Sequence, residues 1–321
     1  MLKLSKIVLF FVLCSSFFSC GTSDDPGDVN IPENTISNFL LNNSNYSVLA
    51  AGLNRTGLDS LLNTTQQFTI FAPTNAAFNS FLSDNDFTNI NDVPLDELEN
   101  YLRYHVQPGA ITLDEFPDGY IRSLAIGNAS DRLLSMYTST ADDSFYINNE
   151  AEVVIAQANI KLDNGYLNPI RTFLSLPNIG DFLLVSQQES ALSFYSLLSA
   201  NSSGNYLEDL RSEEEVYTIL QASEEAIQNF LEANDYSSIS DIPQNTLERI
   251  IENHIISAEN IRTEAIVDTL NVTANSGRQL KFYEDNGPKI ILDNEVVVNI
   301  TTPNIQAVNG VVQVVDQIII E

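Results

Sequence analysis

The stretch Phe68-Thr69-Ile70-Phe71-Ala72-Pro73-Thr74-Asn75-Ala76-Ala77-Phe78 changes character at its proline. The aromatic and β-branched residues at its start predict a strand that Pro73 ends, because proline cannot donate to a sheet ladder. Thr74 is expected to cap a following helix, since its hydroxyl can accept a backbone N–H of the first turn. Phe78 and Phe81 would then face inward. The stretch predicts a strand that leads directly into an amphipathic helix.

The same pattern returns 149 residues later, in the segment that begins at Tyr217. Ser223 takes the place of Thr74 and can cap a helix in the same way. The chain has two histidines, His105 and His254, and these keep the same offset. The length of 321 residues also agrees with about two domains. The chain is therefore predicted to contain two related domains in tandem.

Each repeat combines a helical front half with a strand-rich back half. In the first repeat, apolar residues at helical spacing precede the strand, and a second stripe from Leu95 to His105 follows it. His254 ends the matching stripe in the second repeat. The back halves predict the strands 133–137, 145–148 and 153–160, then 279–283, 289–292 and 296–300. Asn-Gly pairs at 164–165 and 309–310 predict turns before a closing strand.

These features divide the chain into four parts. Residues 1–19 are predicted to be a signal peptide and residues 20–33 a flexible tether rich in Gly, Ser, Asp and Pro. The first domain is expected over residues 34–176 and the second over residues 177–321. A joint of a few residues, containing Pro177 and Gly180, implies that the two domains touch.

The N-terminal segment carries the features of a lipoprotein signal. Lys3 and Lys6 precede a 12-residue apolar run that is too short to span a bilayer. The run ends at Ser19-Cys20, which resembles the lipobox of bacterial lipoproteins, so Cys20 is expected to be the lipid attachment site. Several acyl chains on one residue would anchor the protein firmly. Ser23-Asp24-Asp25 resembles the export signal of Bacteroidetes surface lipoproteins, which favours display at the outer membrane, facing outward.

The ordered landmarks of both repeats resemble the fasciclin domain family. They are the Phe68–Phe78 block, the histidine at the helix end, and the Asn-Gly turn before the closing strand, and together the two copies cover nearly all of the mature chain. The resemblance implies an α+β fold in which a bent β-wedge carries a helical layer. It also implies adhesion or extracellular binding without family-wide catalytic residues. Pro169 departs from the pattern, so the closing strand of the first repeat is expected to lie at an edge, form a bulge or end early.

The charge balance limits the partners. The chain contains 14 Lys and Arg but 43 Asp and Glu, which gives a net charge of −29. Such a field repels phosphate backbones, so nucleic-acid binding is excluded. The expected partners are the membrane, through the N-terminal lipid, and an extracellular protein or glycan.

No reactive constellation stands out in the sequence. Both histidines continue apolar helix faces, which indicates structural roles, and in the resembling family this histidine is structural. Two histidines so far apart, with no cysteine left after Cys20 is acylated, cannot form a zinc site. Acidic runs at Asp84-Asn85-Asp86 and Asp142-Asp143 lack the glycine and distal glutamate of an EF-hand. We therefore expect no catalytic residue, metal or cofactor.

The sequence favours a non-enzymatic adhesion or extracellular binding lipoprotein. A glycan-binding accessory protein of a polysaccharide uptake system remains an alternative, which an exposed aromatic platform would favour. A glycan hydrolase that uses a carboxylate pair is a second alternative, because carboxylates are plentiful.

Overall fold

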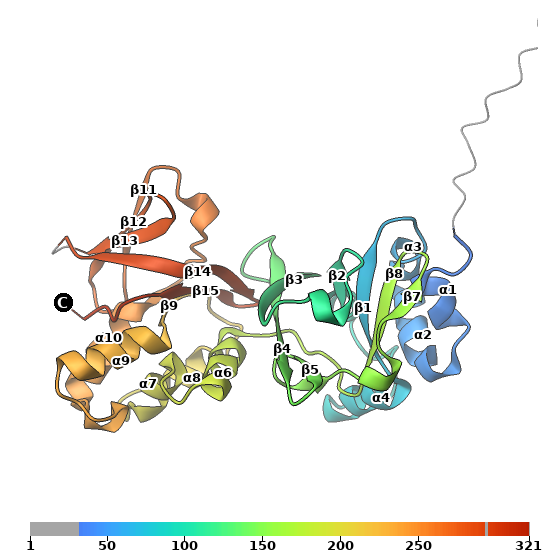
Figure 1. Cartoon of the computed structure of the whole chain (residues 1–321), viewed down its shortest axis with the longest axis horizontal. Coiled ribbons are helices and arrows are strands. Elements are labelled where there is room, and N and C mark those ends of the chain that lie inside the picture. The colour runs from blue at the N-terminus through green and yellow to red at the C-terminus, as the bar shows by residue number, and fades with distance from the viewer. Residues whose placement is uncertain (1–31, 293–294, 321) are drawn as a thin grey trace, which may run out of the picture. The chain divides into compact units, whose positions relative to one another are not determined.

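The computed structural model describes residues 32–292 and 295–320, coloured by residue number in Figure 1. The segment Pro32–Glu321 forms one compact unit that holds both repeats. The predicted signal peptide, Cys20 and the tether up to residue 31 lie outside the described residues. Within the described part of the chain, no helix is both long enough and apolar enough to cross a membrane.

The helical layer of repeat one is built from short, capped helices. Thr35 caps the first helix, and Thr74 caps the fourth by accepting the N–H of Ala77 at 3.3 Å, as predicted. The second helix ends where Gly57 adopts a left-handed conformation with φ of 76°. The helices are α1 (Ile36–Leu41), α2 (Ser47–Thr56), α3 (Leu58–Leu61), α4 (Asn75–Asp84) and α5 (Leu95–Tyr104).

The strands of repeat one form two four-stranded sheets, in the orders β2-β1-β8-β7 and β3-β4-β5-β6. The predicted strand at Phe68 is β1, which pairs in parallel with the closing strand β8. The strands are β1 (Phe68–Pro73), β2 (Val106–Pro108), β3 (Gly119–Ile126), β4 (Leu133–Ala141), β5 (Ser144–Ile147), β6 (Ala151–Glu152), β7 (Ile160–Leu162) and β8 (Gly165–Ile170).

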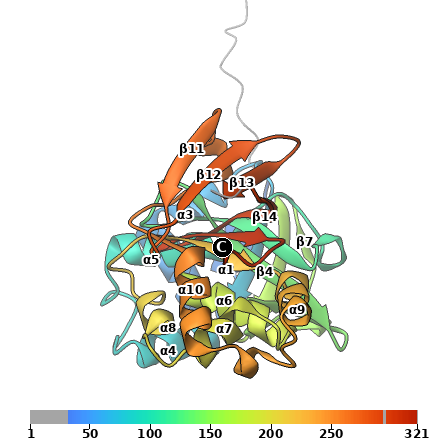
Figure 2. The same ribbon diagram turned by 90° about the vertical axis from the view of Figure 1, so that its left-hand side faces the viewer.

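Repeat two has the same plan with one continuous seven-stranded sheet, in the order β10-β9-β15-β14-β13-β12-β11. Figure 2 shows its helices and strands β11 to β13 on opposite sides of the closing strands. The helices are α6 (Ile179–Glu189), α7 (Phe194–Ala200), α8 (Tyr206–Asp209), α9 (Glu224–Ala233) and α10 (Gln244–His254). The strands are β9 (Tyr217–Ala222), β10 (Ile255–Ser257), β11 (Thr269–Thr273), β12 (Gln279–Glu284), β13 (Pro288–Leu292), β14 (Val297–Ala307) and β15 (Gly310–Val315).

Each repeat packs a core on both sides of its central strand. In β1, Phe68 and Ile70 point to a helix-side core, whereas Phe71 points to a sheet-side core. In β9, Ile219 points to the helix-side core and Leu220 points to the sheet-side core. This follows from the two-residue period of a strand, because a fully apolar strand can serve two cores at once. The predicted α+β fold with two tandem domains is confirmed.

One predicted strand is wrong. Residues 153–160 were expected to form a strand, but Val153 makes only an isolated bridge, to Ile170, and residues 155–157 form a 3₁₀ turn. Strand pairing begins again only at Ile160, the first residue of β7. Asn159 then adopts φ of 54° and donates its backbone N–H to the Asn168 side chain at 2.7 Å. These local bonds outweigh the β propensity of the segment. The strands β3 and β11 were not predicted.

Pro169 does not end the closing strand of repeat one early. The pairing of β8 with β1 continues through Ala72↔Pro169 to Pro73↔Ile170. The carbonyls of Asn164 and Ile170 accept the N–H groups of Phe68 and of Thr74, the residue after β1, so Pro169 faces the other way, beyond the end of β7. Its missing N–H therefore costs no ladder bond with β1.

Two further residues do not lie where the sequence predicts. Leu95 lies in the first turn of α5 and is 48% exposed, so it is not part of the buried stripe. Gly180 lies inside α6 rather than in the joint, where the Arg211 side chain packs against it.

The two repeats touch along what we call the seam. Gln306 donates its backbone N–H to Ser135 Oγ at 2.9 Å, and Ala129 donates to the Val308 carbonyl at 2.9 Å. Val308 itself is buried in the sheet-side core of repeat one. The turn after β14 therefore completes the core of the preceding repeat.

Candidate functional site

His105 is fully buried directly after α5. Its Nε2 accepts the backbone N–H of Leu174 at 3.0 Å, so Nδ1 carries the proton and donates to the Tyr101 carbonyl at 2.8 Å. The ring centroid lies 4.4 Å from that of Phe173. Both ring nitrogens are therefore engaged by the backbone.

His254, at the end of α10, repeats the Nε2 contact of His105, but its Nδ1 bonds to a strand rather than to its own helix. Its Nε2 accepts the N–H of Ile319 at 2.8 Å, and its Nδ1 donates to the carbonyl of Leu220 in β9. Burial lowers the pKa of both histidines to about 4, so each ring is neutral at neutral pH. The structural role that the sequence predicts for His105 and His254 stays a prediction.

The acidic runs occupy turns. Asp142 and Asp143, with φ of 51° and 62°, form the two-residue connection between β4 and β5, and Asp86 has φ of 60° after α4. Aspartate is one of the residues that tolerates this conformation. In residues 32–292 and 295–320, no three His, Cys, Asp or Glu side chains are grouped as metal ligands.

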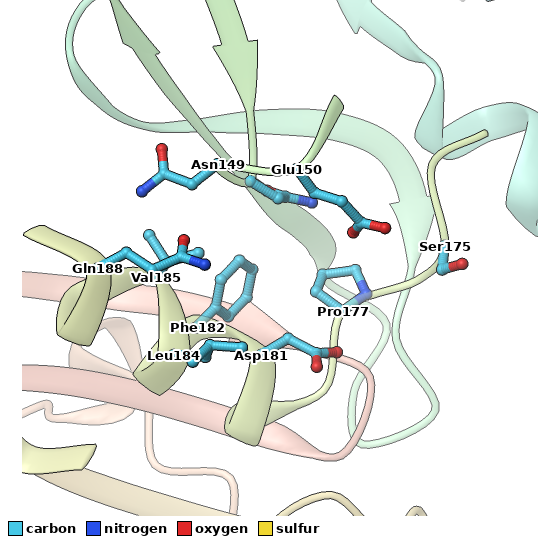
Figure 3. A pocket seen from close by; sticks show the side chains of 10 residues that line it. Asn149, Glu150, Ser175, Pro177, Asp181, Phe182, Leu184, Val185 and Gln188 are labelled. Carbon is cyan, nitrogen blue, oxygen red and sulfur yellow. The ribbon is translucent and has the colours of Figure 1, made fainter. Parts of the chain in front are cut away.

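A depression of about 270 Å³ lies where the two repeats meet (Figure 3). Three segments form its walls: the turn after β5, the joint, and α6. In Figure 3, Asn149 and Glu150 lie opposite the α6 side chains Phe182 and Gln188.

Two further depressions adjoin it. One, of about 390 Å³, is lined by Tyr137 and Tyr146 and shares Asn149 and Gln188 with the first. The other, of about 220 Å³, reaches α4 and shares Glu150 with the first. We call the three depressions together the trough.

The β4–β5 hairpin gives the trough an aromatic face. Ser139 pairs with Tyr146, so Tyr137, two residues before Ser139, lies on the same face of the hairpin as Tyr146. Both tyrosines are half-buried. On the opposite face, Met136 and Phe145 enter the sheet-side core. The core therefore fixes the orientation of the tyrosine face.

The first two depressions are acidic. Their carboxylates are Asp118, Glu150, Asp181 and Glu189, and no Lys or Arg is among the described residues that line them. Burial and the facing Asp181 raise the pKa of Glu150. Burial also raises the pKa of Asp181, against the opposing effects of the Asn178 N–H and Arg211.

The comparisons with known proteins identify the fold. The sequence matches the Fasciclin domain over residues 44–177 and again over residues 191–321. The chain belongs to the fasciclin domain family.

Relatives agree with this assignment. Protein sll1483 of Synechocystis is 31% identical over 136 residues, which cover 42% of this chain and 70% of that protein. The pig transforming growth factor-beta-induced protein ig-h3 is 30% identical over 151 residues, which are 46% of this chain but only 20% of that protein. A solved fasciclin domain pair from the insect cell adhesion molecule fasciclin I matches with a TM-score of 0.52 and 15% identity. That match covers 85% of this chain and 97% of the pair.

Fasciclin domains are associated with adhesion and extracellular binding, and the proteins that carry them are generally non-catalytic. The sequence drew attention to the two fasciclin histidines but not to the trough. The trough residues come from separate segments of the two repeats. The one available signal was alternation in the strand 133–137, which sets Tyr137 opposite the buried Met136.

Proposed function

We propose that this fasciclin-domain protein is a non-enzymatic binding protein of the cell surface that serves adhesion. The observation that carries the proposal is the pair of fasciclin domains itself. The seam supports it, because hydrogen bonds and the inserted Val308 hold the two domains together as a preformed binding surface. The buried histidines also support it, since backbone groups occupy both ring nitrogens in each domain.

The proposed location is the outer membrane, with a lipid on Cys20 and the domains facing outward. The apolar run, the Ser19-Cys20 pair and Ser23-Asp24-Asp25 in the sequence support this. Mass spectrometry of the N-terminal peptide from the membrane fraction would detect an acylated Cys20. Protease treatment of intact cells should then degrade the protein, whereas protection until the cells are lysed would place it inside the outer membrane.

Adhesion is tested with three strains: the parent, a deletion strain, and a strain with Cys20→Ala. We expect attachment to extracellular matrix or to neighbouring cells to fall in both altered strains, because the domains are lost from the surface in each. Attachment at the parental level in the deletion strain would contradict the proposal.

Glycan capture is a second candidate function. The specific observation in its favour is the tyrosine face of the trough, because aromatic rings with adjacent hydrogen-bonding groups suit sugar rings. A glycan array screened with the purified mature chain would test this function independently of adhesion. Release of reducing sugar from a bound glycan would instead indicate the hydrolase that the sequence left as a further alternative.

A further inference from the structure

The trough has the form of a site for an extended ligand. Its three depressions follow one another and share lining residues, with Asn149 and Gln188 at one junction and Glu150 and Ser175 at the other. A small molecule would fill one depression, whereas a chain can occupy all three. The arrangement favours a linear polymer.

The trough is preformed by the folded protein. Asn149 Nδ2 donates to Glu189 Oε1 at 2.8 Å, which joins the turn after β5 to the end of α6. Asn148 is held by Tyr137 and Tyr104, and Ser139 donates to Asn149 Oδ1 at 2.6 Å. Because these side chains are fixed before any ligand arrives, the turn after β5 needs no ordering when a ligand binds.

Other polar groups of the trough have no partner among the described residues. These are the Tyr137 and Tyr146 hydroxyls, the Gln188 amide and the Ser175 hydroxyl. They offer both donors and acceptors beside two aromatic faces. A ligand rich in hydroxyl groups, with apolar C–H faces, matches this combination.

The backbone pairing of β5, which carries Tyr146, argues against a peptide ligand that binds as an added strand. The strand β5 is paired with β4 on one side and with β6 on the other. Its N–H and C=O groups are therefore committed to the sheet, whereas addition of a peptide strand needs a free edge.

The negative charge of the trough restricts the class of polymer that it can bind. Four carboxylates line the inter-repeat and tyrosine depressions, and Arg171 lines only the third. A uronate, sulfated or phosphorylated polymer would be repelled along most of its path. We propose that the trough binds an uncharged glycan chain, with Tyr137 and Tyr146 as its aromatic platform and Gln188 as a hydrogen-bonding contact. This inference rests on the binding function proposed above and names its ligand class and site.

The test uses affinity gel electrophoresis with the whole mature chain carrying Cys20→Ser, so that it is soluble. The neutral probes are xyloglucan, mannan, laminarin and starch, and the anionic probes are alginate, polygalacturonate and heparin. We expect at least one neutral polysaccharide to retard the protein and none of the anionic ones to do so. Tyr137→Ala and Tyr146→Ala should each weaken the retarding interaction about tenfold.

Two further variants separate binding from folding. Tyr283→Ala removes a half-buried tyrosine from β12, outside the trough, and should bind as the parent does. Gln188→Ala truncates an exposed side chain of α6 and should weaken binding without lowering the melting temperature.

Retardation by none of the neutral probes overturns the trough proposal, and so does unchanged binding by both trough tyrosine variants. Retardation by an anionic probe that Tyr137→Ala abolishes would overturn the charge argument. Adhesion of intact cells is measured in parallel with the lipid-anchored protein. If adhesion depends on the protein while no neutral polysaccharide binds, the trough proposal fails and the adhesion proposal stands.

Discussion

At the scale of single residues, the two histidines share one repeated contact, in which Nε2 accepts a distant backbone N–H. Each joins a helix end to a segment far along the sequence, through the N–H of Leu174 in one repeat and of Ile319 in the other. A buried N–H without an acceptor costs about 1–3 kcal/mol. The imidazole therefore satisfies groups that an apolar side chain would leave unpaired.

We predict that His254→Phe destabilises the protein although an aromatic ring, somewhat larger than imidazole, still fills the site. The substitution leaves the Ile319 N–H and the Leu220 carbonyl without their partner, so we expect a loss of about 3 kcal/mol in the free energy of unfolding. Urea denaturation monitored by circular dichroism would measure it. The exposed Gln228→Ala serves as a control and should change the stability by less than about 0.5 kcal/mol.

The same variant should alter the pH dependence of stability. His254 has a pKa of about 4 when folded and 6.5 as its ordinary value. Between these values the unfolded state binds more protons, so stability falls as the pH is lowered from about 6.5 to 4, by about 3 kcal/mol for each histidine. His254→Phe retains only the contribution of His105. An equal pH slope in the variant and the parent would show that His254 is not the titrating group.

At the scale of elements, an Asn-Gly pair ties each closing strand to the helical layer. Asn164 accepts the N–H of Ile36 at 2.8 Å, and Asn309 accepts the N–H of Ile179 at 2.9 Å. Asn309 also donates to the Leu210 carbonyl at 2.9 Å. The turn therefore sets where the first helix of each repeat begins.

The glycine of this pair is required by close packing. In Gly310, φ is 148°, and a Cβ atom would meet the carbonyl oxygen of Tyr217 in β9. We predict that Gly310→Ala costs at least about 3 kcal/mol, because the parallel β9–β15 pair must separate to admit the methyl group.

Gly277→Ala is the matched control. Gly277 also has a positive φ, of 88°, but nothing lies within 4 Å of its Cβ position. Gly277→Ala should lower the free energy of unfolding by about 1 kcal/mol, because only the backbone conformation is unfavourable for alanine. Thermal unfolding of both variants checks the comparison, and equal losses would exclude the steric explanation.

At the scale of the whole molecule, the seam couples the two fasciclin domains. Val308 from repeat two is only 2% exposed and packs in the sheet-side core of repeat one. Tyr120 of repeat one in turn lies 5.4 Å from Phe182 of repeat two, ring to ring, in an edge-on arrangement. Each repeat therefore supplies a residue to the packing of the other.

We predict that the parent protein unfolds in a single cooperative transition and that Val308→Asp separates it into two. A buried, unpaired carboxylate costs at least about 3 kcal/mol and would open the seam. Differential scanning calorimetry would resolve the transitions, and limited proteolysis should cut the joint near Pro177. Val297→Asp, at a 39% exposed valine, should keep the single transition. Two transitions in the parent would contradict the coupling.

The sequence by itself determined the repeat, the α+β class, the helix caps and the positions of the histidines. These depend on local chemistry: strand and helix periods, a hydroxyl that accepts an N–H, and residues that repeat at a fixed offset. The net charge of the chain also follows from the sequence, because it depends only on composition.

Only the tertiary structure decided the break at residues 155–157, the continuity of β8 through Pro169, the seam and the trough. Each depends on which distant segments meet, as when Val154 donates to the Pro169 carbonyl or Asn149 to Glu189. Such contacts are set by tertiary packing, within one repeat or between the two, and leave no periodic signal in the chain. Tyr137 and Gln188 have ordinary sequence surroundings, and folding alone brings them to the same surface.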